Sequence, residues 1–69
     1  MILSDLLDAV AERDRLFDDV LTVFQRSQAA WASRDQMAFS VQCLNYHATV
    51  TQWRQAKEHV EAICERMES

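Results

Sequence analysis

Apolar side chains recur at helical spacing over the first half of the chain. Two neighbouring lines repeat every seven residues: Leu3, Val10, Phe17, Phe24 and Trp31 form one, and Ile2, Ala9, Leu16, Val23 and Ala30 form the other. Further apolar residues widen this stripe, namely Leu6, Leu7, Val20 and Leu21. A stripe this broad is typical of a helix that packs in a bundle. We therefore expect a helix from about residue 4 to about residue 32, with Ser4 as its N-cap.

The phase of the apolar pattern changes after Trp31. A new stripe then follows in alternating steps of four and three: Phe39, Cys43, Tyr46, Val50, Trp53, Lys57, Val60, Cys64 and Met67. Between the two stripes, Ser33 and Gln36 have the spacing of a capping box, with Ser33 as the N-cap. The pattern predicts a turn at about residue 33 and a second helix over about residues 34–67. The chain is then a single all-α domain, residues 1–69, folded as an antiparallel two-helix hairpin. The alternative is one continuous helix of about 100 Å.

The second predicted helix also has a shorter apolar line on the side opposite its main stripe. This line consists of Met37, Val41, Leu44 and Ala48. A helix that is apolar on two sides cannot bury both against one partner helix. We therefore expect two hairpins to pair through this line as a homodimer, which makes a four-helix bundle with two-fold symmetry.

Composition agrees with an all-helical chain and limits its size. The 69 residues include no glycine and no proline, the residues that tight turns and hairpins of β-proteins use most. A chain of this length has only a marginal hydrophobic core by itself, so oligomerisation is the expected source of further burial. The first residues lack the basic start of a signal peptide, and no apolar stretch approaches the roughly 18 residues of a membrane span. We expect a cytoplasmic protein.

The charge balance favours a basic partner over nucleic acid. Seven basic residues face eleven acidic ones, which gives a net charge of −4, and the basic residues are scattered along the chain. A surface that binds nucleic acid needs clustered basic residues, so we expect no direct contact with DNA or RNA. The acidic residues Asp5, Asp8, Glu12 and Asp19 share one helix face with Arg15. That face is either simply solvated or a docking ridge for a basic partner.

Aromatic and titratable side chains supply the other candidate sites. Trp31 and Tyr46 lie near the end of a stripe or helix and are candidates for partner contact, whereas Phe39 and Trp53 are expected in the core. Cys43 and His47 are four residues apart and could share a metal, but a zinc site needs three or four ligands. The two cysteines are instead expected to be buried, reduced thiols. We expect no metal, no cofactor, no small-molecule substrate and no catalytic residue, and hence no enzyme.

The chain as a whole is similar to a family of small phage proteins. In its size, acidity and helical character, and in segments such as Met1-Ile2-Leu3-Ser4-Asp5-Leu6-Leu7 and Trp31-Ala32-Ser33-Arg34-Asp35, it resembles the phage-encoded anti-quorum-sensing anti-activators. The resemblance implies a compact helical dimer that binds the DNA-binding domain of a LuxR-type quorum-sensing regulator and blocks transcription activation. It also implies inhibition of the pilus-assembly ATPase, and the cytoplasm of the bacterial host as the place of action.

Two functional hypotheses remain from the sequence. The first is a small inhibitor that binds a host transcription regulator through its acidic helical face, because such a face complements the basic recognition surface of a helix-turn-helix domain. The alternative is a helical dimeric chaperone or an antitoxin-like partner protein, which would use its apolar surface instead.

Overall fold

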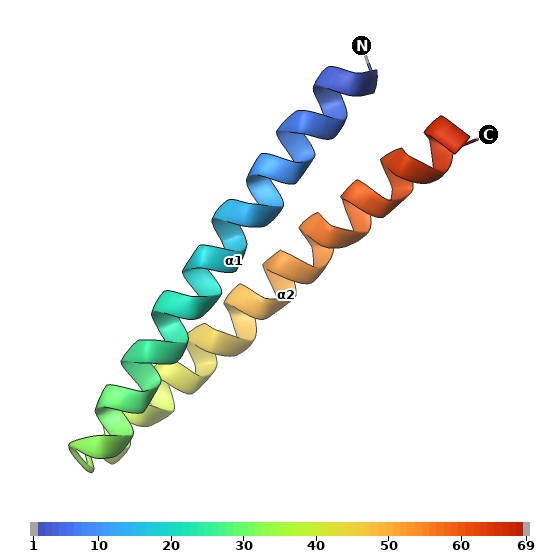
Figure 1. The fold of residues 1–69 in the computed structure, drawn as a ribbon. Helices are drawn as coiled ribbons and strands as arrows, with labels where there is room; N and C mark the ends of the chain where they lie inside the picture. Colours follow the sequence, from blue (N-terminus) through green and yellow to red (C-terminus); the bar gives the residue numbers. More distant parts are fainter. Residues whose placement is uncertain (1, 69) are drawn as a thin grey trace.

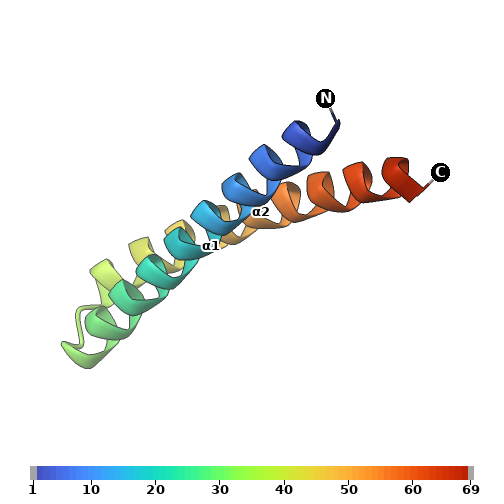
Figure 2. The same cartoon turned by 45° about the horizontal axis from the view of Figure 1, so that its top comes forward.

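The chain folds as a hairpin of two long antiparallel helices. The structure is a computed structural model, and it describes residues 2–68. Helix α1 spans Ile2–Ala32 and helix α2 spans Gln36–Glu68, with no strand among the described residues. The two helices lie side by side in both views, and the chain ends lie together at the end opposite the turn (Figures 1 and 2). The hairpin measures 51 × 14 × 12 Å. This confirms the predicted hairpin and excludes one continuous helix.

The first helix starts earlier than the sequence suggested. Ile2 and Leu3 are already helical, so Ser4 lies inside the first turn and the prediction that it caps the helix is wrong. Asp5 lies in the same turn, where its carboxylate interacts favourably with the positive end of the helix dipole. The start of α1 is therefore supported by charge at Asp5 and not by a serine cap.

A left-handed arginine ends α1 and reverses the chain. The amide of Asp35 donates to the carbonyl of Ala30 at 3.1 Å, and the amide of Arg34 donates to the carbonyl of Trp31 at 3.0 Å. These are the two hydrogen bonds of a Schellman motif, in which glycine usually occupies the position that Arg34 takes here. Arg34 has a φ of 58°. A glycine-free chain therefore makes its turn at the conformational cost of an arginine in the left-handed region.

Asp35 caps the second helix. Its Oδ1 accepts a hydrogen bond of 3.0 Å from the amide of Ala38, the third residue of α2, which is the geometry of an N-cap. The prediction that Ser33 plays this part is wrong, because its hydroxyl donates to the carbonyl of Ala30 at the end of α1. Helix α2 consequently begins at Gln36, two residues later than predicted.

The two helices meet along one stripe of each, which we call the hairpin seam. On α1 the seam consists of buried or partly buried residues in alternating steps of three and four: Leu6, Ala9, Arg13, Leu16, Val20, Val23, Ser27 and Ala30. On α2 the same spacing gives Phe39, Gln42, Tyr46, Thr49, Trp53, Ala56, Val60 and Ile63, of which Tyr46 is just exposed. This is the repeat of two helices packed as in a coiled coil.

The best-packed part of the seam lies at the end with the chain termini. Ala9, Val60 and Ile63 form its buried cluster, with Leu6, Val10 and Cys64 packed against them. Ile63 is the most deeply buried side chain, at 1% exposure. Toward the turn, the seam contains the polar residues Ser27, Gln42 and Thr49. The buried apolar cluster of the hairpin therefore lies at its open end.

The structure also corrects which apolar residues face the partner helix. Of the two lines predicted on α1, the one through Ala9 and Leu16 faces α2, and the one through Phe17 lies beside the seam. On α2, Cys43 belongs to a line next to the seam and is exposed, so the prediction of a buried thiol is wrong there. Cys64 is partly buried, as a small apolar side chain at the edge of the core.

We expect a glycine at position 34 to stabilise the protein. Arg34→Gly should raise the free energy of unfolding by about 1 kcal/mol, because glycine adopts positive φ without the steric cost that a Cβ imposes. Arg34→Ala keeps the Cβ and is the control, with an expected change near zero. Urea unfolding followed by circular dichroism measures both. Equal gains from the two variants would show that the arginine side chain, and not the backbone conformation, is unfavourable.

We also expect the protein to become more stable when a buried polar side chain of the seam is replaced by an apolar one. The Oε1 atom of Gln42 is buried and has no hydrogen-bond partner among the described residues. Gln42→Leu should raise the free energy of unfolding by about 1–3 kcal/mol, the typical cost of an unsatisfied buried polar group. Gln55→Leu, on the exposed side of the same helix, controls for the added leucine and should change stability by less than about 0.5 kcal/mol. A destabilised Gln42→Leu variant would show that the amide is satisfied in solution.

Candidate binding surfaces

Surfaces of different character flank the hairpin seam. Asp5, Glu12 and Asp19 each precede a seam residue by one position, whereas Phe17 and Phe24 each follow one. At about 100° per residue, these two sets project to opposite sides of the seam. We call the first side the acidic edge, which consists of Asp5, Asp8, Glu12 and Asp19. The hollow beside it is lined by the polar residues Glu12, Arg15, Gln52 and Gln55, together with Leu16 and Ala56.

The other side is lined by aromatic rings, and we call it the aromatic edge. Three pairs of rings join the helices there, with centroid distances of 5.8 Å for Phe17–Trp53, 6.1 Å for Phe24–Tyr46 and 5.3 Å for Trp31–Phe39. The members repeat every seven residues on each helix, so the pairs form a ladder along the hairpin. The rings are tilted by 44° to 55°, a geometry that adds favourable quadrupole contacts to the burial.

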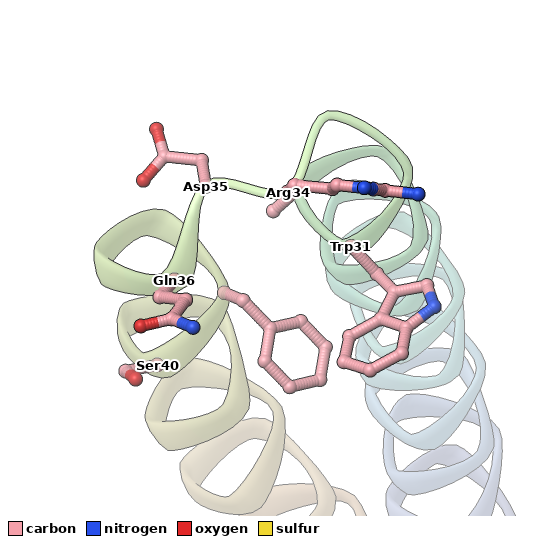
Figure 3. A pocket seen from close by; sticks show the side chains of 7 residues that line it. Trp31, Arg34, Asp35, Gln36 and Ser40 are labelled. Atoms are coloured by element: carbon pink, nitrogen blue, oxygen red, sulfur yellow. The ribbon is translucent and has the colours of Figure 1, made fainter.

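The aromatic ladder remains open to solvent, above all near the turn. Phe17 and Phe24 are each 45% exposed, and Trp31 is 70% exposed. A shallow groove runs past Phe24 and Trp31 and is also lined by Cys43 and Tyr46. At the turn, Trp31 and Arg34 lie on the α1 side of a second hollow and Gln36 on the α2 side, with the Asp35 carboxylate pointing away (Figure 3). Exposed aromatic rings of this kind are typical contact residues in protein interfaces.

Arg15 neutralises the middle of the acidic edge. Its guanidinium donates from Nε to Glu12 at 3.0 Å and from Nη1 to Asp19 at 3.4 Å. The hydrogen bond from Arg15 lowers the pKa of the Glu12 carboxyl from its ordinary value. Asp5 and Asp8 make no ion pair with another described residue. The uncompensated negative charge of the edge therefore lies at the start of α1.

The six residues predicted to contact a partner do not form one patch. Asp5 and the other acidic residues lie on the acidic edge, and all four are exposed. Trp31 and Tyr46 lie on the aromatic edge, where each also packs against a ring of the other helix. Trp53 and Phe39, expected in the core, are partly buried in the same ladder. The structure thus separates the predicted partner residues into two surfaces on opposite sides of the seam.

The second apolar line of α2, which we call the α2 outer line, faces away from α1. It consists of Met37, Val41, Leu44 and Ala48. Met37 is 80% exposed and Leu44 72% exposed, so the hairpin leaves this line uncovered as the sequence suggested. Its use as a dimer interface stays a prediction.

The titratable groups do not form a metal site among residues 2–68. Cys43 and His47 lie one turn apart on α2 and are both exposed. No group of three or more His, Cys, Asp or Glu side chains in the described part of the chain could hold a metal ion. Neither described helix is long and apolar enough to cross a membrane. The candidate sites of this chain are therefore its exposed surfaces.

Comparisons of the chain with protein-family profiles, with curated proteins and with solved structures find no match.

We expect metal removal to leave the protein unchanged. A two-residue Cys43–His47 pair is too few ligands for a structural zinc site. Adding a chelator should change neither the helical circular dichroism signal nor the melting temperature. A loss of helix on chelation, restored by zinc, would instead show a bound metal and contradict this expectation.

Proposed function

We propose that this protein is a small homodimeric, protein-binding inhibitor of a transcription regulator. More specifically, we propose a phage accessory protein that acts in the cytoplasm of the bacterial host. It binds the DNA-binding domain of a LuxR-type quorum-sensing activator and blocks it, and it also inhibits the pilus-assembly ATPase. The specific target rests on the resemblance of the whole chain to phage anti-activators. The general activity, binding of a basic protein surface, is supported by the acidic edge.

The charge distribution carries the proposal. DNA-binding domains present basic side chains that neutralise phosphates, and an acidic surface competes for those side chains. Asp5 and Asp8 lie in the first two turns of α1, exposed and without a described ion-pair partner. A basic recognition helix laid against this end of the hairpin would find carboxylates that are already free. It would then have no access to its operator.

The alternative is a helical dimeric chaperone or antitoxin-like partner protein. The observation that favours it is the α2 outer line, where Met37 and Leu44 present exposed, flexible apolar side chains. A flexible side chain such as that of Met37 can adapt to varied apolar segments. A protein that acts in this way would bind its partner with little dependence on salt.

We expect the start of α1 to control binding of the regulator. Asp5→Lys with Asp8→Lys should weaken binding to a purified LuxR-type DNA-binding domain at least about tenfold at low salt, mainly through slower association. Glu58→Lys with Glu61→Lys, on exposed positions of α2, adds the same charge elsewhere and should have a much smaller effect. Association rates are measured by surface plasmon resonance at two salt concentrations, with operator release followed in parallel.

Three results would contradict the proposal. The first is that no LuxR-type DNA-binding domain binds the purified protein. The second is that binding leaves the regulator on its operator. The third is that the α1 and α2 charge reversals weaken binding equally, which would show that the acidic edge is not the contact surface. Salt-independent binding that is lost on Met37→Ala with Leu44→Ala would favour the chaperone alternative.

A further inference from the structure

Helix α1 has a second apolar stripe that the hairpin covers only in part. We call it the open stripe, and it runs the whole length of α1 in alternating steps of four and three: Leu3, Leu7, Val10, Asp14, Phe17, Leu21, Phe24, Gln28 and Trp31. Leu3 is 57% exposed, Leu7 63% and Leu21 45%. Alternating steps of three and four are the spacing of a surface that packs along another helix. The one charged member, Asp14, is bound by Arg13 at 3.1 Å.

The hairpin exposes more surface than a compact monomer of its mass, and the excess is about what one partner buries in an interface. The chain exposes 5426 Å², whereas a compact monomer of 8.0 kDa would expose about 4,450 Å². The difference, about 1,000 Å², is close to the ~800 Å² that each partner buries in a stable interface of standard size. A single stripe of a 31-residue helix, Ile2–Ala32, is long enough to supply it.

The pattern of the open stripe indicates which helix covers it. If two copies of α1 cross antiparallel at Phe17, then Leu3 lies opposite Trp31 and Val10 lies opposite Phe24. These facing pairs, with Phe17 on Phe17, are apolar, whereas Leu7 and Leu21 lie between them, opposite Ser27 and Arg13. The corresponding side of α2 is more polar, with Ser40, His47, Arg54, Lys57 and Glu61 among its residues. Packing α1 on this side of the α2 of another copy would therefore bury leucines against charged side chains.

We propose that a second copy of this chain covers the open stripe, with α1 packed antiparallel on α1 of the other copy across a two-fold axis near Phe17. This inference deepens the homodimer of the proposed function and replaces the α2 outer line as its interface. In such a dimer the aromatic edge of each hairpin faces the other copy, so Trp31 contributes to self-association. The acidic edge and the α2 outer line stay free on both copies, where a partner protein can reach them.

A matched pair of leucine substitutions tests this assignment. Leu7 on the open stripe and Leu44 on the α2 outer line are exposed to similar degrees, 63% and 72%, and neither belongs to the hairpin seam. Leu7→Glu places an unpaired charge in the interface and should raise the dimer dissociation constant at least about 100-fold. Leu21→Glu should do the same, and Leu44→Glu should leave a dimer like the wild type. Sedimentation equilibrium at micromolar concentration measures all four proteins, with circular dichroism as the check on helix content.

The outcomes separate this inference from the proposed function. Monomeric Leu44→Glu with dimeric Leu7→Glu would place the interface on the α2 outer line and overturn the inference alone. A wild-type monomer that still binds the regulator's DNA-binding domain would overturn the dimer and leave the inhibitor proposal standing.

Cross-linking keeps the inference falsifiable if the glutamate variants unfold. In a background of Cys43→Ser and Cys64→Ser, Leu3→Cys and Trp31→Cys chains are mixed and oxidised. The antiparallel arrangement predicts a disulfide between the two different chains. Disulfides only between identical chains would indicate parallel packing and contradict the proposal.

Discussion

Two helices can bury only the side chains that face each other, and this limit governs the whole molecule. The hairpin seam uses one stripe of each helix, and only Ile63 within it is almost completely buried. Nearly half of the residues are apolar, more than one seam can hide. The remainder must lie on the outside, as the aromatic edge, the open stripe of α1 and the α2 outer line. A chain of this composition folded as a lone hairpin leaves the kind of apolar surface that marks an interaction site.

The same limit decides where function can reside. A two-helix hairpin has no interior large enough for a buried site, so recognition must use its surfaces. The seam divides these by character, with carboxylates such as Asp5 on one side and rings such as Phe24 on the other. If the aromatic side is used for self-association, the acidic side remains for a partner of opposite charge. The proposed dimerisation and the proposed inhibition then use different residues.

The sequence predicts the two helices and the hairpin well, because the apolar phase breaks where the turn lies. It does not determine which stripe of α1 faces α2, since two neighbouring lines have the same period. The structure buries the small residues Ala9 and Ala30 between the helices, and Phe17 and Phe24 pack beside the seam. On α2 the seam passes through Gln42, Thr49 and Ala56, whereas the apolar pattern favoured the adjacent Cys43, Val50 and Lys57.

The position of the turn could be predicted from the apolar pattern, but its backbone conformation and its capping residue could not. The spacing of Ser33 and Gln36 fits a capping box. In the structure Arg34 has positive φ, and Asp35, the residue before Gln36, is the N-cap of α2 instead. Because arginine is rarely found at positive φ, its presence at position 34 gave no reason to predict that conformation. The candidate surface residues were largely predicted as exposed, yet their separation into two sides follows only from the phase of the seam.

If a second copy completes the core of the hairpin, as proposed above, thermal unfolding must depend on protein concentration. When folding is coupled to association, the melting temperature rises with protein concentration by mass action. We expect a clear rise when the chain is concentrated about 100-fold, from roughly 1 μM to roughly 100 μM, in unfolding followed by circular dichroism. A cooperative transition at one melting temperature over that range would show that the hairpin is complete alone, and would contradict the account.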